Sequence, residues 1–363
     1  MSAMTSVKKT FIIAEAGVNH NGSIALAREL IDAAVSAGAD AVKFQSFIAS
    51  SFVTPKATKA EYQITNTGTN ESQLEMLQKL ELSHPQQREL FNYCQNRDIQ
   101  FLSTPFDLAS LKFLTADLGL ETIKIGSGEL TNTPFLYEVA RSTTRIILST
   151  GMSTIGEVAD TLGVIAFAMT HDSSQTPTPN SIVAALASPE GRSAIESRVT
   201  LLHCTTDYPT KPSDVNLNAM LTLRDRFGCQ VGFSDHSIGV HLAVAAVAMG
   251  ATIIEKHMTT SRDLPGPDHI TSLEPSEFKT LVNQIREVEQ ALGNGEKNPT
   301  AVEIETKRIV GRSLVASRSI KTGELFTTNN VAIKRPGGGR SPFEYWALLG
   351  TKSTRDVAEN EII

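Results

Sequence analysis

The sequence predicts an α/β protein, a (β/α)8 TIM barrel followed by a small C-terminal domain. Three observations support this fold class. The chain has 363 residues, which is enough for one barrel of roughly 250 residues plus a small module. Eight short apolar runs are each followed by polar residues and a helical pattern. The polar stretch Asn294–Thr300 then opens a linker, so we expect a barrel domain at 1–293, a linker at 294–303 and a second domain at 304–363.

The eight apolar runs are the expected strands. Between them, segments such as Ser23–Ala37 and Pro275–Leu292 repeat apolar residues at three- and four-residue spacing, as helices packed on a sheet do. Eight parallel units close into a barrel; the alternative is an open doubly wound sheet, but no GxGxxG fingerprint follows the first run. The runs are Phe11–Ala14, Ala41–Phe44, Gln100–Ser103, Thr122–Ile125, Arg145–Leu148, Val199–Leu202, Val231–Phe233 and Thr252–Glu255.

Two connections are long. The segment 48–82 follows the second strand, at the end of a barrel where active sites form, so we interpret it as a lid or substrate loop. The segment 171–198 precedes a strand and lies at the opposite end, so we expect a surface insertion without a catalytic role. The domain 304–363 is short for an independent core and is expected to pack on the barrel or on another subunit.

Composition excludes several classes of function. Lys and Arg number 33 against 39 Asp and Glu, a net charge of −6, and no basic stripe is present to bind a nucleic acid. The three cysteines, Cys94, Cys204 and Cys229, suit a reducing compartment, so no disulfide is expected. The sequence shows neither an apolar run near the roughly 20 residues of a membrane span nor a signal peptide. We therefore expect a soluble cytoplasmic protein.

Polar residues that can bind or react follow every expected strand. In a barrel the carboxyl ends of the strands meet at one face, so these side chains are expected to form one site. Their convergence from eight strands is stronger evidence than any one of them alone. They are Glu15, Asn19, His20, Lys43, Gln45, Ser103, Thr104, Lys124, Ser127, Glu129, Ser149, Thr150, His203, Thr205, Tyr208, Ser234, Asp235, His236, Glu255 and His257.

Five of these residues indicate binding of a small anion. Lys43 and Lys124 supply positive charge, and the hydroxyls of Thr104, Ser127 and Ser149 supply hydrogen-bond donors. A phosphate group is the ligand that this set suits best.

Two histidines and three glutamates suggest metal and proton chemistry. His236 and His257 follow neighbouring strands, so two neutral imidazoles can meet at one divalent metal, with water or substrate oxygens completing its shell. Glu15, Glu129 and Glu255 can act as a base, orient a water or stabilise a cationic centre; the alternative is that they form buried ion pairs with the lysines. Cys204 alternates away from His203 and is expected in the core, which is where free cysteines usually lie.

Nine ordered motifs resemble the sialic acid (nonulosonic acid) synthases. The resemblance covers nearly the whole chain, and the tail at 312–339, RSLVASRSIKTGELFTTNNVAIKRPGGG, resembles the antifreeze-like SAF domain that ends these enzymes. The motifs are IIAEAGVNHNG (12–22), AVKFQ (41–45), FLSTPFD (101–107), KIGSGELTN (124–132), ILSTGM (147–152), LLHCTTDYPT (201–210), GFSDHSIG (232–239), IIEKHMT (253–259) and GPDH (266–269).

The resemblance implies a metal-dependent transferase that joins phosphoenolpyruvate to an N-acylated amino sugar and releases phosphate. The sugar would be N-acetylmannosamine or 2,4-diacetamido-2,4,6-trideoxymannose, and the product N-acetylneuraminate or legionaminate. The segment 58–83 resembles that of both kinds of synthase, so the sugar stays open. Two alternatives are a related synthase that uses a phosphorylated sugar, which would need a further cationic cluster, and a barrel that binds carbohydrate without catalysis.

The resemblance also assigns roles. A divalent metal is implied, with Mn²⁺ preferred for its oxygen ligands and Mg²⁺ as the alternative. Thr206 stands where some members have Asn. Arg335 is implied to enter the site of the other subunit, in a domain-swapped homodimer. The remaining roles are His236 and His257 for the metal, Lys43, Thr104, Lys124, Ser127 and Ser149 for phosphoenolpyruvate, Glu15, Glu129 and Glu255 as site carboxylates, and Tyr208 and Asp268 for the sugar.

Overall fold

The computed structural model describes residues 9–69, 71–335 and 338–363. The N-terminal residues 1–8, and Pro336 and Gly337 of the KRPGGG motif, lie outside the described part. The chain divides into two compact units, Met1–Gly293 and Asn294–Ile363. No helix in the described ranges is long and apolar enough to cross a membrane.

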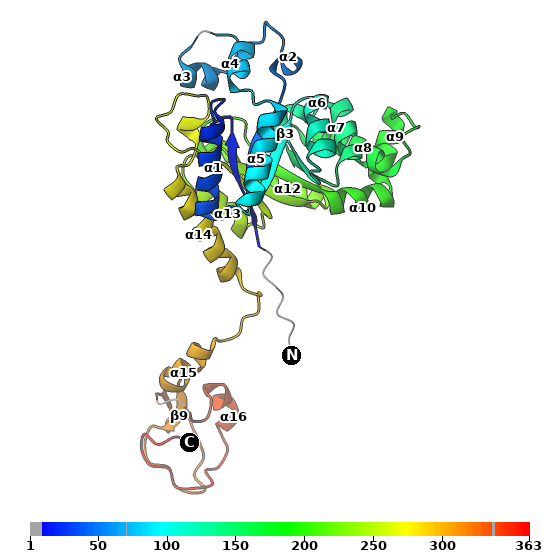
Figure 1. Cartoon of the computed structure of the whole chain (residues 1–363). Coiled ribbons are helices and arrows are strands. Elements are labelled where there is room, and N and C mark those ends of the chain that lie inside the picture. Colours follow the sequence, from blue (N-terminus) through cyan, green and yellow to red (C-terminus); the bar gives the residue numbers. More distant parts are fainter. Residues whose placement is uncertain (1–8, 70, 336–337) are drawn as a thin grey trace. The chain divides into compact units, whose positions relative to one another are not determined.

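Eight parallel strands form the centre of the first unit (Figure 1). Their hydrogen-bonded order is β3-β2-β1-β8-β7-β6-β5-β4, and β3 also contacts β4, so the sheet curves into a barrel and the predicted fold class is confirmed. Each strand begins within a residue of its expected position, but most run one to three residues further. The strands are β1 (Phe11–Gly17), β2 (Ala41–Ser46), β3 (Gln100–Pro105), β4 (Thr122–Ile125), β5 (Arg145–Ser149), β6 (Val199–Cys204), β7 (Gln230–Asp235) and β8 (Ile253–His257).

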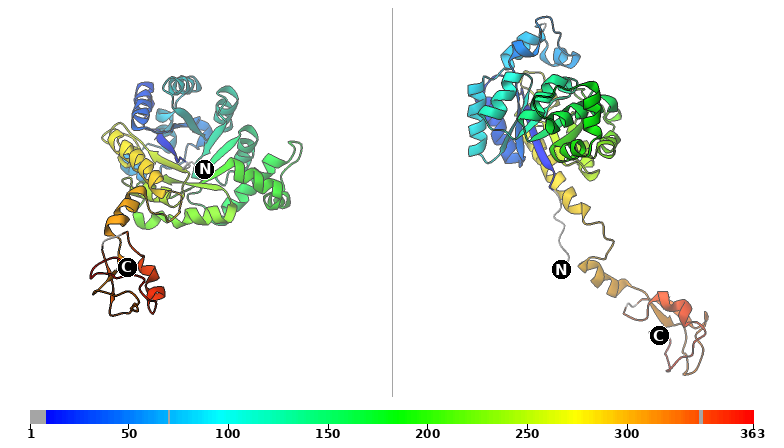
Figure 2. Two further views of the ribbon diagram at one scale, coloured as in Figure 1. Left: turned by 90° about the horizontal axis from the view of Figure 1, so that it is seen from below. Right: turned by 90° about the vertical axis from the view of Figure 1, so that its right-hand side faces the viewer.

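Helices surround this barrel, as the view along it in Figure 2 shows. Their apolar faces and the outer face of the strands form the main core, which includes Phe44, Phe233 and Phe278. A smaller layer, with Ile13 and Leu202, fills the inside of the barrel. The helices are α1 (Ile24–Ala37), α5 (His84–Asn96), α6 (Leu108–Lys112), η1 (Phe113–Asp117), η2 (Ser127–Glu129), α7 (Thr133–Ser142), α8 (Ile155–Thr170), α11 (Pro212–Val215), α12 (Asn218–Phe227), α13 (His241–Ala248), η3 (His269–Thr271) and α14 (Pro275–Leu292).

The connection after β2 is folded into three short helices: α2 (Ala49–Phe52), α3 (Glu61–Thr67) and α4 (Gln73–Leu80). We call residues 49–80 the β2–α5 excursion; it lies above the barrel in Figure 1. Apolar residues of α2 and α4, together with residues just beyond β1 and β2, form a separate small core. This core fixes the excursion at the carboxyl end of β2. This core consists of Val18, Phe47, Ala49, Met76, Leu77 and Leu80.

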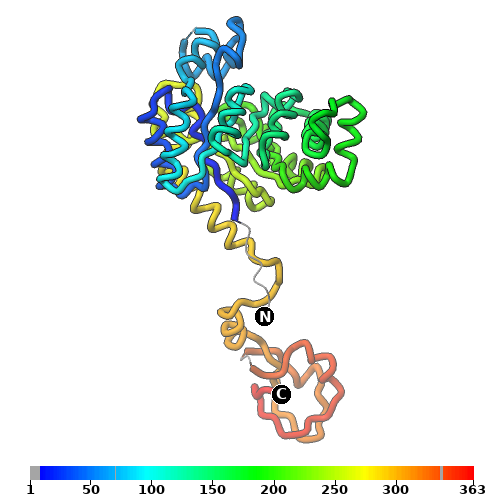
Figure 3. The backbone as a smooth tube through the Cα atoms, turned by 45° about the vertical axis from the view of Figure 1, so that its right-hand side comes forward, coloured from blue at the N-terminus to red at the C-terminus, as the bar shows by residue number. Residues whose placement is uncertain are grey.

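The segment 171–198 also contains helices, α9 (Pro179–Ala187) and α10 (Pro189–Arg198). Both pack against α8, and α10 leads directly into β6, in the green part of the trace in Figure 3. Its position before a strand agrees with the expected surface insertion, and its lack of a catalytic role stays a prediction.

The second unit contains α15 (Ala301–Val310), β9 (Ser313–Ala316), β10 (Val331–Lys334), η4 (Pro342–Glu344) and α16 (Tyr345–Leu348). β9 and β10 are antiparallel. Leu314, Phe326, Leu348 and Val357 belong to a small core of its own. α15 begins inside the stretch 294–303 that the sequence suggested as a linker.

Candidate active site

A polar cavity of about 180 Å³ lies at the carboxyl ends of the strands. Each of the eight strands contributes a lining side chain, and segments beyond β3, β4, β6, β7 and β8 and the β2–α5 excursion contribute others. The lining residues are Glu15, Lys43, Gln45, Tyr62, Thr104, Phe106, Lys124, Gly126, Ser127, Gly128, Ser149, Cys204, Thr206, Tyr208, Ser234, His236, Glu255, His257 and Asp268. A larger and more open pocket of about 640 Å³ adjoins it, but the charged groups line the smaller cavity.

Two lysines and two glutamates form a buried network on the cavity floor. The Nζ of Lys43 lies 2.6 Å from Oε2 of Glu15 and 3.7 Å from Oε2 of Glu255, and the Nζ of Lys124 lies 3.6 Å from Oε1 of Glu255. Burial opposes ionisation of Glu255, but Lys124, Lys43 and a hydrogen bond from Ser234 outweigh it and lower its pKa to about 2.

The pKa of the other carboxylate, Glu15, shifts in the opposite direction. Burial raises the pKa of Glu15 to about 7, because it outweighs the attraction of Lys43, and the nearby charge of Glu255 adds to the shift. Glu255 therefore stays ionised near neutral pH, while Glu15 exchanges a proton in that range.

Hydroxyl groups surround the two ammonium groups. Lys43 donates to Oγ1 of Thr104 at 3.2 Å, and Lys124 donates to Oγ of Ser149 at 2.8 Å. The hydroxyl of Ser127 accepts from the backbone N–H of Gly151 at 2.9 Å. The predicted anion-binding set therefore lies together in one cavity.

Cys204 is buried, but it lines this cavity rather than the core between strands and helices, so its expected place was wrong. Its Sγ lies 3.1 Å from the hydroxyl of Ser127. The reason is strand alternation: Leu202 and Cys204 face into the barrel, whereas His203 faces outward, where its Nε2 lies 2.6 Å from the carbonyl oxygen of Val215.

His236 and His257 lie together on the other side of the cavity, with ring centroids 5.6 Å apart. The Nδ1 of His236 lies 2.6 Å from the carbonyl oxygen of Thr205, so we assign the proton to Nδ1. The Nε2 then carries the lone pair, and the hydroxyl of Ser234 lies 3.4 Å from it. Among the described residues, the buried Nδ1 of His257 has no hydrogen-bond partner. Burial lowers the pKa of His236 to about 4 and that of His257 well below its usual value, so both rings are neutral.

Each neutral imidazole keeps one unprotonated ring nitrogen, and a pair of such nitrogens fits a divalent metal ion. The described side chains contain no cluster of three or more His, Cys, Asp and Glu residues that could hold one. A metal held by His236 and His257 would therefore keep most of its coordination positions for water and substrate oxygens.

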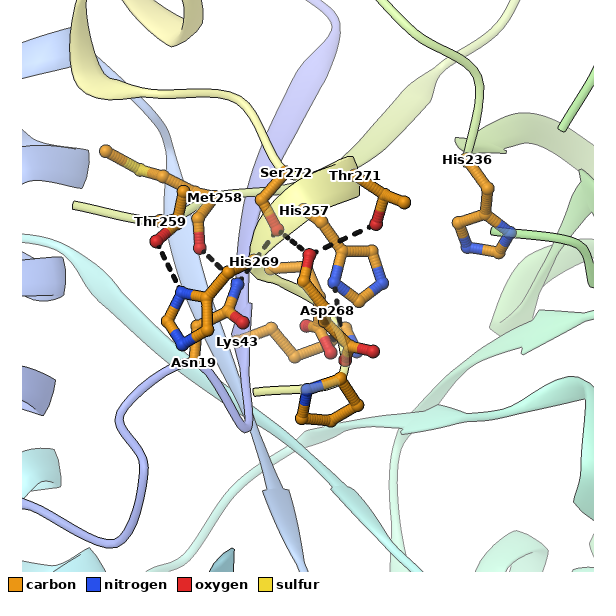
Figure 4. Close-up of polar contacts among 12 residues, drawn as sticks. Asn19, Lys43, His236, His257, Met258, Thr259, Asp268, His269, Thr271 and Ser272 are labelled. Carbon is orange, nitrogen blue, oxygen red and sulfur yellow. Dashed lines mark hydrogen bonds and ion pairs between the residues drawn. The ribbon is translucent and has the colours of Figure 1, made fainter. Parts of the chain in front are cut away.

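Aromatic and acidic side chains complete this side of the cavity. The ring of Tyr208 lies 4.1 Å from that of His236, centroid to centroid, and the ring of Tyr62 lies 4.8 Å from that of Tyr208. Oδ2 of Asp268 lies 3.9 Å from Nδ1 of His257 (Figure 4). Tyr62 was not among the predicted site residues, because a single tyrosine in a polar stretch gives no signal of its own.

A hydrogen-bond network holds the loop that carries Asp268 (Figure 4). Asn19, which follows β1, donates to the carbonyl oxygen of Met258 at 2.8 Å and to the hydroxyl of Ser272 at 2.9 Å. The hydroxyls of Ser272 and Thr271 donate to the backbone carbonyl of Asp268 at 2.7 and 3.1 Å. Asn19 thus ties this loop, which follows β8, to the end of the neighbouring strand β1.

Several residues that the sequence placed at the site do not line the cavity. Among the strand-end residues these are Asn19, His20, Ser103, Thr150, His203, Thr205 and Asp235. Two residues with roles implied by the resemblance also lie elsewhere. Glu129, on η2, is buried beside the cavity without lining it, and its carboxylate accepts from the side-chain amide of Asn132 at 2.7 Å. Arg335 is exposed in the second unit. The expected roles of both stay predictions.

An eight-stranded parallel barrel with buried lysine, glutamate and histidine side chains at the carboxyl ends of its strands defines a TIM-barrel enzyme. Residues 30–297 match the NeuB family, and residues 311–363 match the SAF domain. The chain belongs to the NeuB family.

Its relatives match over nearly their whole length. The chain is 45% identical to an N,N'-diacetyllegionaminic acid synthase of Campylobacter jejuni, over 98% of this chain and 99% of that protein. It is 40% identical to the Legionella pneumophila protein of the same name, over 96% and 91%. A crystal structure of N-acetylneuraminic acid synthetase from Leptospira borgpetersenii has 31% identity and a TM-score of 0.66, covering 84% of this chain and 93% of that one.

Proposed function

We propose that this protein is a nonulosonic acid synthase that condenses phosphoenolpyruvate with 2,4-diacetamido-2,4,6-trideoxymannose. The products are N,N'-diacetyllegionaminate and phosphate. The two relatives named above support this sugar over N-acetylmannosamine. The observation that carries the proposal is the cavity in which two buried lysines face two neutral histidines.

The chemistry joins C3 of phosphoenolpyruvate to the aldehyde carbon of the open-chain sugar. The aldehyde oxygen gains a proton, a water supplies the oxygen added at C2, and phosphate leaves. The chain's task is to bind one anionic and one neutral substrate with the reacting carbons in contact and other water excluded.

Phosphoenolpyruvate fits the side of the cavity formed by β2 to β5. Lys43 and Lys124 provide two positive charges. Glu255 balances one of them, and Glu15 balances the other only when it is ionised. Thr104 and Ser149 already accept hydrogen bonds from the lysines, so they are placed to share a bound phosphate or carboxylate group. Glu15 can hold or release a proton beside this group, because its pKa is about 7.

His236 and His257 would hold the implied metal, with Mn²⁺ preferred and Mg²⁺ as the alternative. Such an ion supplies Lewis acidity that polarises an aldehyde oxygen. The bond between His236 and the carbonyl oxygen of Thr205 keeps one ring nitrogen directed at the cavity. His257 and Asp268 lie beside the same space, on the side we assign to the sugar.

We also propose a domain-swapped homodimer in the cytoplasm. In it, Arg335 of the second unit enters the site of the partner subunit and contacts the acyl group of the sugar. The resemblance of the tail to SAF-containing synthases supports this arrangement, together with the match of residues 311–363 to the SAF domain.

A product assay tests the proposed function. Purified protein with Mn²⁺ is given phosphoenolpyruvate and either the diacetamido trideoxy sugar, N-acetylmannosamine or a phosphorylated aldose. Phosphate release and product mass are measured for each, with a control that lacks sugar. We expect turnover with the diacetamido sugar. Preference for the phosphorylated aldose would support the related synthase instead, and sugar binding without phosphate release would support a non-catalytic barrel.

A further inference from the structure

The two sides of the cavity differ in chemistry. Among the lining residues, Lys43 and Lys124 supply positive charge beside Glu15 and Glu255, whereas Tyr62, Tyr208 and Asp268 lie near the two histidines. An anionic ester is drawn to the lysines, which leaves the aromatic and acidic side for a neutral, acylated sugar. Tyrosine suits such a ligand, because its ring packs on C–H and methyl groups while its hydroxyl bonds polar ones.

Tyr62 comes from α3 in the β2–α5 excursion and extends the row of rings on this side. Its ring centroid lies 4.8 Å from that of Tyr208, at an interplanar angle of 30°. Tyr208 in turn packs on His236 at 4.1 Å. The row therefore leads from α3 to one of the expected metal ligands, and Tyr62 is its outer member.

α3 is tied to the loop that carries Asp268. The side-chain amide of Asn66 donates to the carbonyl oxygen of Pro267 at 2.6 Å. The buried ammonium of Lys59 donates to the hydroxyl of Thr67 at 2.9 Å and to the carbonyl oxygen of Thr69 at 2.7 Å, which stabilises the turn after α3. Tyr62 and Asp268 are thus held on the same wall of the cavity by a direct link between their two segments.

The position of α3 does not depend on an apolar core of its own. None of its seven residues is buried, and the small core of the excursion is built from α2, α4 and the ends of β1 and β2. Tyr62 is only half-buried and its exposed part lines the cavity. A large aromatic side chain in this place is better explained by ligand contact than by packing.

We infer that Tyr62 binds the acylated amino sugar and sets the selectivity of the site for it. The inference rests on the proposed function. The ring contacts C–H or acyl methyl groups of the sugar, and Asp268 accepts hydrogen bonds from its hydroxyl or amide groups. Phosphoenolpyruvate does not contact Tyr62.

Steady-state kinetics of Tyr62→Ala and Tyr62→Phe test this inference. Tyr62→Ala is expected to raise KM for the amino sugar about tenfold or more, the loss typical of one apolar contact in a pocket. KM for phosphoenolpyruvate and kcat should stay within about twofold, because a contact made equally in ground and transition states affects KM alone. Tyr62→Phe keeps the ring and should raise the sugar KM by about threefold.

Thr65→Ala is the matched control. Thr65 is exposed on the same helix and bonds only within it, donating to the carbonyl oxygen of Glu61 at 3.0 Å. It should match the wild type in all constants. An unchanged sugar KM in Tyr62→Ala would overturn the inference, as would an equal rise in both KM values with a lower melting temperature, which indicates a structural role.

Calorimetric titration of the sugar alone separates this inference from the proposed function. Binding to the wild type that weakens in Tyr62→Ala supports the sugar contact even if no turnover occurs with phosphoenolpyruvate. No binding to the wild type, under conditions where the protein is folded, overturns the inference. If the wild type turns over and Tyr62→Ala binds the sugar as tightly as the wild type, the proposed function is supported. The same result shows that Tyr62 does not contact the sugar.

Discussion

Replacing Lys124 by methionine removes one of the two positive charges from the cavity floor at similar side-chain volume. The side chain of Lys124 is only 3% exposed, and its Nζ donates to Ser149 at 2.8 Å and to the carbonyl oxygen of Ile125 at 3.1 Å. In the proposed reaction this ammonium pairs with an oxygen of phosphoenolpyruvate. Lys124→Met should therefore weaken binding of that substrate alone.

The size of the effect follows from burial. A charge-assisted hydrogen bond contributes about 1.5–3 kcal/mol, which corresponds to roughly ten- to a hundredfold in affinity. The upper part of this range applies here, because Glu255 lies 3.6 Å from Lys124. Without Lys124, Lys43 is the remaining cation that pairs with Glu255, so the Glu255 carboxylate repels the phosphoenolpyruvate anion more strongly. The KM for the amino sugar should change by less than about threefold, since the contacts of Lys124 are with Ile125, Ser149 and Glu255 rather than with Tyr208 or Asp268.

The assay is phosphate release, with each substrate varied while the other is saturating. Lys112→Met is the control, because Lys112 is exposed at the end of α6. Thermal unfolding of both variants checks that the barrel is intact. Equal increases in both KM values in a folded Lys124→Met protein would refute the assignment and make Lys124 a structural lysine.

Four further predictions concern the metal, the dimer and the excursion. Excess chelator should abolish turnover and Mn²⁺ should restore it, as phosphate release would show; full activity in chelator would contradict metal dependence. His236→Ala and His257→Ala should each lose metal-dependent activity yet keep the circular-dichroism spectrum of the wild type, because both residues line the cavity. Mixing Arg335→Ala with His236→Ala subunits should restore up to about a quarter of wild-type activity after random exchange, and verified heterodimers without activity would argue against swapping. Gly22→Ala should lower the free energy of unfolding by about 1–3 kcal/mol in denaturant titration, since Gly22 has a φ of +75° and a Cβ would lie 2.5 Å from the carbonyl oxygen of Lys79; an unchanged midpoint would contradict this.

The sequence was sufficient to locate all eight strands, because apolar β-branched runs bounded by polar loops recur at regular intervals. Their carboxyl ends were placed too early. β1 continues past Ala14 through Glu15 to Gly17, and β8 continues past Glu255 to His257. In a functional barrel these last residues are polar because they face the site, so a pattern based on apolar residues ends a strand before its functional part.

The site was predictable to the extent that strand ends determine it. Lys43 and Lys124 were found because each is a charged residue within a short apolar strand. His257 was found because it ends β8, and His236 because it follows β7. Tyr62 was not, since its place depends on α3 folding back over the barrel, a long-range contact that no local pattern encodes. Cys204 was assigned to the core from its residue type, although the alternation that places Leu202 inside the barrel also places Cys204 at the cavity.

The β2–α5 excursion carries its own small core, built from residues such as Phe47, Met76 and Leu80. The stability of the barrel therefore does not constrain the residues of α3, which take no part in either core. During evolution, substitutions at positions such as Tyr62 can alter the sugar that is accepted without a cost to folding. One contact still limits the sequence of α3. Asn66 donates to the carbonyl oxygen of Pro267, so an altered α3 must keep a hydrogen bond to the loop that carries Asp268. Selectivity in this barrel is thus expected to change through paired substitutions in the excursion and that loop, while the lysines that bind the shared substrate stay fixed.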